Sequence, residues 1–293
     1  MRSAAPASAS RSALTRAGVR AGAAALGLLL GLAIWWLVIE WLVTPGTILA
    51  RFAPAEALGT LARLVADGDL SGHAAASLRR IAAGLAVAAA VGIPLGIALG
   101  SARLLARVGG PVLGILRMIS PLAWTPIAII VFGVGDAPVV FLIGVGATWP
   151  IMMSTQAGVV GLDPAWLRVS RSLGATRLES LRHVIWPGIR PNILTGLRIA
   201  TGLAWVILVP AEMLGVDSGL GYFILDARDR FAYDELVAAI ILIGILGLAI
   251  DTLSRTVFSG QRRRAPRRLR APGGLPWVGA AERVPGRTPA GSR

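Results

Sequence analysis

The chain has 293 residues, of which 55% are hydrophobic and only 15% are charged, and its mean hydropathy is +0.71. Soluble domains carry more charge than this, so the composition predicts a membrane protein. Every basic residue is arginine and there is no cysteine, which excludes a Walker A loop with its lysine, a disulfide, a catalytic thiolate and a zinc–thiolate cage. The only histidines, His73 and His183, lie too far apart in the sequence to suggest a metal site.

The net charge of +14 is distributed in a way that favours a membrane surface over nucleic acid. Arginines gather at the two chain ends and beside apolar segments, where they set membrane orientation and meet anionic headgroups. Membrane lipid is therefore an expected partner, and nucleic acid is not.

The N-terminal region begins with residues 1–20, whose Ala/Ser-rich, basic sequence predicts a disordered cytoplasmic segment. Residues 21–43 are apolar apart from Glu40 and long enough to cross a bilayer. A cleaved signal peptide is the alternative, but tryptophans typical of the membrane interface crowd the far end of this segment. These are Trp35, Trp36 and Trp41. We predict an uncleaved first transmembrane helix, followed up to residue 76 by an extracytoplasmic segment with room for a surface helix.

Five further apolar segments predict an all-α polytopic membrane protein with six transmembrane helices. They cover residues 81–100, 112–132, 139–160, 192–214 and 236–258. The second span carries small residues at multiples of four, a spacing that lets helices approach closely, so this face is expected to pack against another span. The residues are Gly84, Gly92, Gly96 and Gly100. Residues 77–258 thus form the predicted core, and 259–293 a disordered, basic cytoplasmic tail.

The loops alternate in charge, which predicts the orientation of the chain. The N-terminus, the loop with Arg103 and Arg107, the stretch between spans four and five and the tail are basic, whereas the alternate loops hold most of the acids. Since basic loops stay on the cytoplasmic side, both termini are expected there. Arg79 and Arg80 are exceptions at the outer start of the second span, and we expect them to reach the headgroups or to pair with loop acids.

The stretch from residue 163 to 191 is a polar island between spans four and five and predicts two short helices around one glycine. Asp163 suits the N-cap of the first helix and Pro164 its first position, and Gly174 can adopt the left-handed conformation that closes it.

The second short helix is predicted by Thr176 and Glu179, which have the spacing of a capping box. Pro187 is expected to stop this helix. A solvated basic loop is the alternative interpretation of the whole stretch.

This stretch resembles the cytoplasmic coupling motif of permeases from binding-protein-dependent ABC importers, which reads Glu-Ala-Ala, three residues, Gly, nine residues, Ile-x-Leu-Pro. Gly174 matches the glycine, Val184 the isoleucine, and Trp186-Pro187 the Leu-Pro. The chain has Arg168-Val169-Ser170 in place of Glu-Ala-Ala, a departure that removes the glutamate. The resemblance implies a contact surface for an ATPase. Its residues are Arg168, Val169, Ser170, Arg171, Leu173, Gly174, Ala175, Thr176 and Pro187.

Residues 77–258 as a whole resemble the permeases of the nitrate, sulfonate and taurine importer group. The supporting stretches, in chain order, are 77–84, 92–96, 120–126, 132–135, 198–205, and 211–213 with 219–222. The resemblance implies a permease homodimer in the bacterial cytoplasmic membrane, with two cytoplasmic ABC ATPase subunits and an extracytoplasmic solute-binding protein. It also implies that ATP and Mg are bound by the ATPase and that this chain needs no cofactor.

Spans three to five combine polar or aromatic side chains with prolines that disturb helices. An unpaired hydroxyl is costly in hydrocarbon, so these groups are expected to face the bundle interior or a wet cavity and to line a translocation path, with helix packing as the alternative for each. The residues are Ser120, Trp124, Thr125, Thr148, Trp149, Trp205 and Glu212. For an anionic solute we expect neutral hydroxyl and indole donors, because a buried arginine would hold the anion too tightly. Glu212 is expected at the outer rim, paired with an arginine.

The sequence therefore predicts a solute-translocating subunit that works by alternating access and is not itself an enzyme. A membrane-embedded enzyme is disfavoured because the acids at span edges are too scattered for a paired general acid and base. A membrane scaffold would not need broken helices. The solute stays open between sulfonate, taurine, nitrate and a heterocyclic vitamin precursor.

Overall fold

The computed structural model describes residues 22, 26–27, 29–39, 41 and 52–259, and these residues form helices and turns. The chain divides after Phe258 into two units, and the account below concerns the first. Of the predicted disordered ends, residues 1–20 and 259–293, only Ser259 is described, as the last residue of a helix. Part of the predicted first span also lies outside the described residues. Within that span a short apolar helix covers Leu29–Ile39.

Helix α2 (Pro54–Asp67) lies in the segment where the sequence left room for a surface helix. Pro54 occupies its first turn, where a proline leaves no hydrogen bond unmade, and Gly68 closes it with a φ of +83°.

Among the described residues, four long helices are apolar enough to cross a membrane, and the predicted spans 81–100, 139–160, 192–214 and 236–258 fall on them in order. These helices are α3 (Asp69–Ser101), α6 (Asp136–Val160), α9 (Trp186–Glu212) and α11 (Tyr233–Ser259). All four begin before the apolar segment does, because hydropathy marks the part of a helix suited to hydrocarbon, whereas the preceding turns continue the same backbone hydrogen bonds.

The third span, predicted over 112–132 with an interruption at Pro121 and Pro126, is broken in that region but begins earlier than predicted. It starts at Arg103, inside the predicted loop, as α4 (Arg103–Leu116), and continues as η2 (Pro121–Trp124) and α5 (Thr125–Phe132). The two halves are bent by 85°. Pro121 and Pro126 lack an N–H and would clash with the preceding turn of a continuous helix, so the chain restarts at each of them.

The glycine face of α3 packs directly against α6, as the spacing predicted. A Cβ on Gly96 would lie 2.6 Å from the carbonyl oxygen of Met152, and one on Gly92 would lie 2.9 Å from that of Thr148. The contacting residues advance together along the two sequences, from Gly92 and Thr148 to Gly96 and Met152, so α3 and α6 run parallel. The absence of side chains brings the two backbones close enough for dispersion contacts to accumulate.

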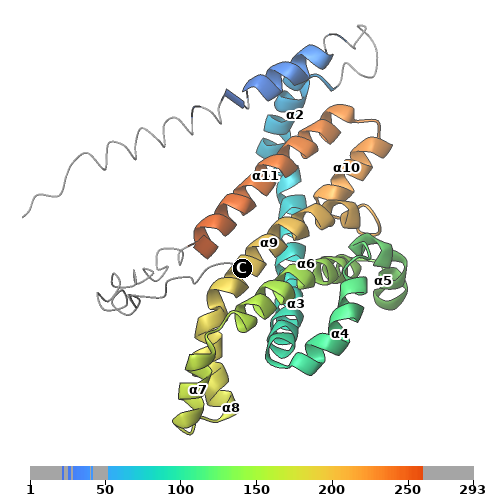
Figure 1. Ribbon diagram of the computed structural model, residues 1–293. Coiled ribbons are helices and arrows are strands. Elements are labelled where there is room, and N and C mark those ends of the chain that lie inside the picture. Colours follow the sequence, from blue (N-terminus) through green and yellow to red (C-terminus); the bar gives the residue numbers. More distant parts are fainter. Residues whose placement is uncertain (1–21, 23–25, 28, 40, 42–51, 260–293) are drawn as a thin grey trace, which may run out of the picture. The chain divides into compact units, whose positions relative to one another are not determined.

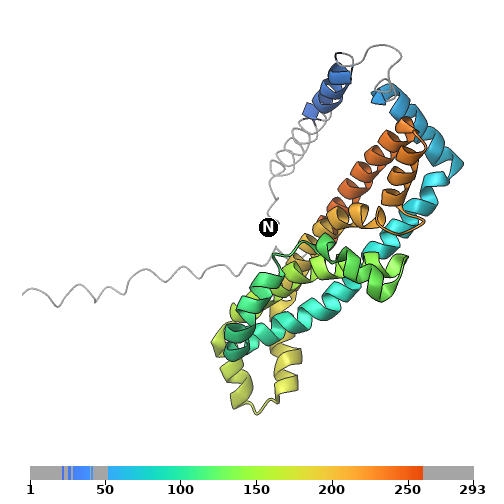
Figure 2. The ribbon, with the colours of Figure 1, turned by 90° about the vertical axis from the view of Figure 1, so that its right-hand side faces the viewer.

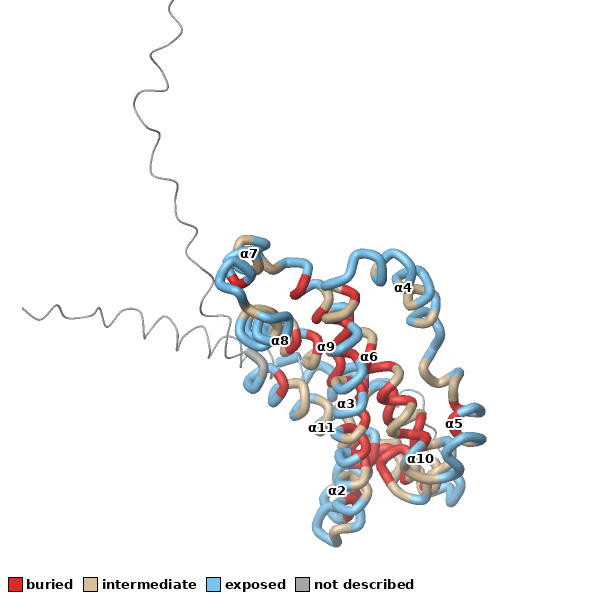
Figure 3. Tube along the Cα trace, turned by 90° about the horizontal axis from the view of Figure 1, so that it is seen from below, coloured by how far each residue is buried: buried red, intermediate tan, exposed pale blue. Residues whose placement is uncertain are grey.

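Helix α9 packs against another side of α6 in the opposite direction. A Cβ on Gly158 would meet Asn192, and one on Gly196 would meet Ile151 and Ser154. Buried residues follow α6 and α9 in Figure 3, whereas no residue of α4 is buried. The core of the unit is therefore the three-helix set α3, α6 and α9.

Candidate functional site

One end of the three-helix core is held by a buried ion-pair network. The guanidinium of Arg80, on α3, lies 2.7 Å from a carboxylate oxygen of Glu212 at the end of α9. A second nitrogen of the same group lies 2.6 Å from Asp136 at the start of α6. The side chain of Arg80 is 1% exposed and that of Glu212 is fully buried. The expectation that both residues pair with opposite charges is confirmed.

The same network fixes the chain that follows α9. The hydroxyl of Ser77 donates to the Glu212 carboxylate and accepts from the backbone N–H of Leu220, each over 2.9 Å. The N–H of Gly221 donates to the other Glu212 oxygen over 3.0 Å. Arg80 also donates to the Ser218 carbonyl. Sequence reasoning did not single out Ser77 as a site residue. Its place one helical turn before Arg80 was the available signal.

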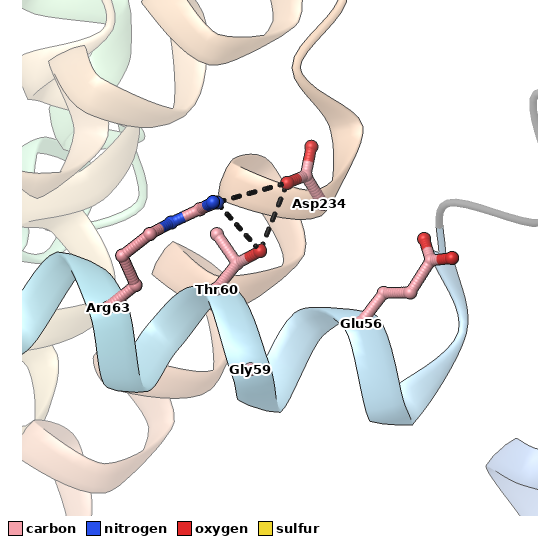
Figure 4. Close-up of a pocket in the computed structure, with 5 residues that line it drawn as sticks. All are labelled: Glu56, Gly59, Thr60, Arg63 and Asp234. Atoms are coloured by element: carbon pink, nitrogen blue, oxygen red, sulfur yellow. Dashed lines mark hydrogen bonds and ion pairs between the residues drawn. The ribbon is translucent and has the colours of Figure 1, made fainter.

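A polar surface pocket of about 300 Å³ lies between α2 and the start of α11 (Figure 4). Thr60 donates to Asp234 over 3.0 Å, and Arg63 lies 3.8 Å from the same carboxylate. The acid and the arginine partner each other, so these contacts fasten α2 to α11.

The helix pair predicted between spans four and five is present and capped as expected. The first helix is α7 (Pro164–Ser172), whose N-cap Asp163 accepts from the N–H of Ala165 over 2.8 Å. Gly174 closes it with a φ of +78°. The N–H of Ala175 bonds to the carbonyl of Ser170, and the N–H of Gly174 to that of Arg171, which is the Schellman pattern.

The second helix, α8 (Arg177–Ser180), starts at the predicted capping box. Thr176 accepts from the N–H of Glu179, and Glu179 accepts from the N–H of Thr176 over 2.8 Å. The hydroxyls of Ser170 and Ser180 lie 2.8 Å apart and tie the two helices together.

An apolar surface of the helix pair is left uncovered. The exposed fractions are 56% for Val169, 79% for Leu173 and 72% for Leu178. Figures 1 and 2 both show α7 and α8 side by side at one end of α6 and α9. The same pair carries Arg168, Arg171 and Arg177, and Arg182 follows in the next turn, so the surface combines apolar side chains with positive charge.

Pro187 does not stop the second helix, contrary to the prediction. The chain passes from α8 through η3 (Leu181–Ile185), a turn of π-helix, into α9 without a break. In this turn the N–H of Trp186 bonds to the carbonyl of Leu181, five residues back. The extra residue changes the hydrogen-bond register just before the proline, so the chain accommodates a residue that lacks an N–H.

Spans three, four and five, which carry the predicted path residues, meet at Gly146 of α6. A Cβ at this position would meet the side chains of Pro121, from η2, and Ile207, from α9. Trp124 and Trp205 both pack against the buried cluster that fills the same region. Glu212, by contrast, belongs to the network at the helix ends.

The hydroxyls of the two path threonines are satisfied within their own segments. Thr148 donates to the carbonyl of Gly144, and Thr125 to that of Leu122, each over 2.7 Å. The indole of Trp149 differs, because its buried Nε1 has no hydrogen-bond partner among the described residues. An indole N–H can only donate, so this position offers a free donor beside the convergence point.

The fold and these sites define a polytopic helical membrane protein with one broken span and an exposed helix pair. Residues 92–264 match the family described as binding-protein-dependent transport system inner membrane component. The match covers more than half of the chain, and the chain therefore belongs to this family. It is thus a permease subunit of the ABC importer type.

Among individual proteins, the chain is similar to permeases named for nitrate, sulfonate and taurine transport. It is 39% identical to the nitrate import permease protein NrtB of Leptolyngbya laminosa over 187 residues, which are 64% of this chain and 67% of NrtB. Identity is 32% to the putative aliphatic sulfonates transport permease protein SsuC of Bacillus subtilis, over 76% of this chain and 80% of SsuC. It is 36% to the taurine transport system permease protein TauC of Escherichia coli, over 80% of this chain and 86% of TauC.

A solved structure supports the fold. A chain of the inward-facing MetNI methionine ABC transporter aligns with a TM-score of 0.56 and 18% identity, over 65% of this chain and 94% of that one.

Proposed function

We propose that this chain forms the transmembrane path of an ATP-driven importer that carries a small oxyanion into the cell by alternating access. Two copies of the chain would enclose the path, two cytoplasmic ATPase subunits would bind and hydrolyse ATP with Mg, and an extracytoplasmic protein would deliver the solute. Nitrate, aliphatic sulfonates and taurine are the solutes named for the similar proteins above, and each is or contains an oxyanion. A heterocyclic vitamin precursor is the alternative solute.

The observation that carries the proposal is the capped α7–α8 pair in a member of this family. Its termini are fixed by a capping box and a Schellman turn, yet its apolar side chains have no cover. A surface that is rigid, apolar and rimmed by arginine suits a groove on an ATPase. Movement of that partner would reach the core through α9, which continues from α8 without a break.

Six spans, with both termini in the cytoplasm of a bacterial cell, agree with the helices described. Helices α3, α6, α9 and α11 would supply four spans and the broken pair α4–α5 a fifth, and Leu29–Ile39 would belong to the sixth. The α7–α8 pair would then face the cytoplasm, and the Arg80–Glu212 network the outside. Four exposed residues of α4 share one helical face, which lipid or the second permease copy would cover. They are Leu104, Val108, Val112 and Ile115.

Reconstitution tests the proposal. The permease is coexpressed with the ATPase and the binding protein encoded beside it and incorporated into proteoliposomes. The binding protein should stimulate ATP hydrolysis, and vesicles should accumulate nitrate, taurine or ethanesulfonate. A membrane scaffold or an embedded enzyme predicts neither result, and a stable complex that shows neither would refute transport.

Cysteine labelling tests the orientation, because the natural chain has no cysteine. Ser218 is engaged by Arg80, so the exposed neighbour Asp217 is the better outer position. Asp217→Cys should react with an impermeant reagent in intact cells, and Ser172→Cys, at the end of α7, should react only after lysis. The reverse pattern would overturn the orientation.

A further inference from the structure

The break in the third span carries an arginine at membrane depth. Arg117 directly follows α4, and its guanidinium lies 3.3 Å from the sulfur of Met153 on α6. Met153 is about 10 Å before the end of α6 at Val160, at 1.5 Å per residue. The helix exceeds the thickness of the hydrocarbon core, about 30 Å, by several ångströms at most at each end. The contact therefore places Arg117 inside the hydrocarbon region.

Arg117 lacks the partner that a charge at this depth requires. Within the described residues its only hydrogen-bond partner is the thioether of Met153, a weak acceptor. Arg79 and Arg80, at the other end of the core, are both paired with carboxylates over 2.7 Å or less. An exposed arginine in a span needs water, an anion or another protein group, and such residues mark solute paths.

A second donor lies one turn away on α6. Met153 and Trp149 are four residues apart and share one face of the helix, at a separation of about 6 Å along its axis. The buried Nε1 of Trp149 has no acceptor in the described part of the chain. A buried donor without an acceptor is costly, and an oxyanion supplies several acceptors at once. Ser120, three residues after Arg117, is exposed at the same break.

Arg198, in the middle of α9, is another arginine without an acidic partner among the described residues, and its position differs. Gly196, two residues before it, faces α6, and Ala200, two residues after it, is buried. Trp205 lies on the same side of α9 as Arg198 and meets Gly247 of α11. Arg198 thus points away from α6 and from the break.

We propose that Arg117 is the cationic group of the solute path, and that it attracts an oxyanion to the break in the third span, within about one helical turn of Trp149. This inference rests on the proposed function and names the charge of the solute. In a water-filled path the charge of the exposed Arg117 would be screened, so that it would raise the local concentration of anions without trapping them. An exposed arginine therefore avoids the tight binding expected of a buried one.

The test measures the electrostatic potential at the break and needs no knowledge of the solute. Ser120→Cys is introduced into the permease, and the complete complex with ATPase and binding protein is placed in nanodiscs. The rates of modification by an anionic, sulfonate-bearing methanethiosulfonate and by a cationic, trimethylammonium-bearing one are compared. The matched control is Arg107→Gln, which removes a charge from the same helix about 15 Å away, beyond the screening length of about 8 Å at physiological salt.

The cysteine should react, and the anionic reagent should be favoured. Arg117→Gln should lower the anion-to-cation rate ratio roughly twofold, the effect of one unit charge at about 8 Å in water, screened at physiological salt, on two oppositely charged reagents. Arg117→Lys and Arg107→Gln should preserve the ratio.

Three results would overturn the inference: no reaction with either reagent, an unchanged ratio in Arg117→Gln, or an equal loss in Arg107→Gln. If Arg117→Gln does not assemble, the ratio in Arg117→Met and Arg117→Lys decides in the same way. Binding-protein-stimulated ATPase activity of the same sample reports on the proposed function separately. Stimulation without a charge-dependent ratio refutes the role of Arg117 alone, and the ratio without stimulation refutes the importer assignment alone.

Discussion

The two ends of the helical core differ in whether their charged side chains are buried and paired or exposed and unpaired. At one end Arg80 and Glu212 are buried and bonded to each other and to the chain after α9. At the other end the arginines of α7 and α8 are not paired with acids within the described residues, and apolar side chains lie uncovered beside them. Charges that hold helices together are satisfied within the chain, whereas unsatisfied ones are left for another molecule.

The physical reason is the cost of removing a charge from water. A buried ion survives only when an opposite charge and further hydrogen bonds replace its hydration, and the Arg80–Glu212 network supplies both. Charges that remain near water carry no such requirement and are free to meet a partner.

Removing one member of the buried pair should have the largest effect. Arg80→Met leaves Glu212 buried without its cation and should lower the free energy of unfolding by about 3–5 kcal/mol, seen as a lower midpoint of thermal unfolding in detergent. Arg79→Met is the control, because Arg79 bonds to the same Asp136 from an exposed position and should cost about 0–1 kcal/mol.

The double variant Arg80→Met/Glu212→Met sharpens the test, since it removes both charges. It should be more stable than Arg80→Met alone. Equal losses of unfolding free energy in Arg79→Met and Arg80→Met would show that the buried network does not stabilise the fold more than the exposed ion pair does.

The second-largest loss of stability is expected from a substitution at the contact between α3 and α6. In Gly96→Ala the added methyl would lie 2.6 Å from the carbonyl oxygen of Met152, and overpacking should cost about 1–3 kcal/mol. Gly72→Ala, near the start of the same helix, has open space and should be neutral or slightly stabilising. Thermal unfolding of the two variants compares them directly, and similar midpoints would contradict close packing at Gly96.

A substitution at the exposed α7–α8 end should reduce coupling to the ATPase more than it reduces the free energy of unfolding. Gly174→Val places a β-branched residue at a φ of +78°, at a cost of about 1–2 kcal/mol confined to the turn between α7 and α8. The permease should insert normally, but stimulation of the ATPase by the binding protein should fall. Gly72→Val is the control, with a free site and an ordinary helical φ. Full stimulation in Gly174→Val would remove the coupling role.

The smallest structural effect is expected at the convergence of the spans. Thr148→Val removes a hydroxyl that bonds only within its own helix, so the free energy of unfolding should change by less than about 1 kcal/mol while solute uptake falls. Thr252→Val is matched, because Thr252 donates to the carbonyl four residues back in α11 over the same 2.7 Å. Wild-type uptake by both variants, at equal membrane levels, would place the path elsewhere.

Features set by neighbouring residues were predictable from the sequence. The N-cap Asp163, the left-handed Gly174 and the Thr176–Glu179 capping box depend on residues within one or two turns, and all three are confirmed. The long apolar helices and the glycine face of α3 follow from composition and period in the same way.

Features that depend on distant residues were decided by the tertiary structure. Arg80 and Glu212 were expected to find opposite charges, but only the parallel packing of α3 with α6 and the antiparallel packing of α9 bring them to each other and to Asp136. The prolines in the sequence predicted that the helices would be disturbed, but not how. The third span breaks near Pro121, whereas the helix that contains Pro187 continues through a π-turn. The difference arises because a proline's missing hydrogen bond is local information, while the contacts that favour a bend or a continuous helix come from other parts of the chain.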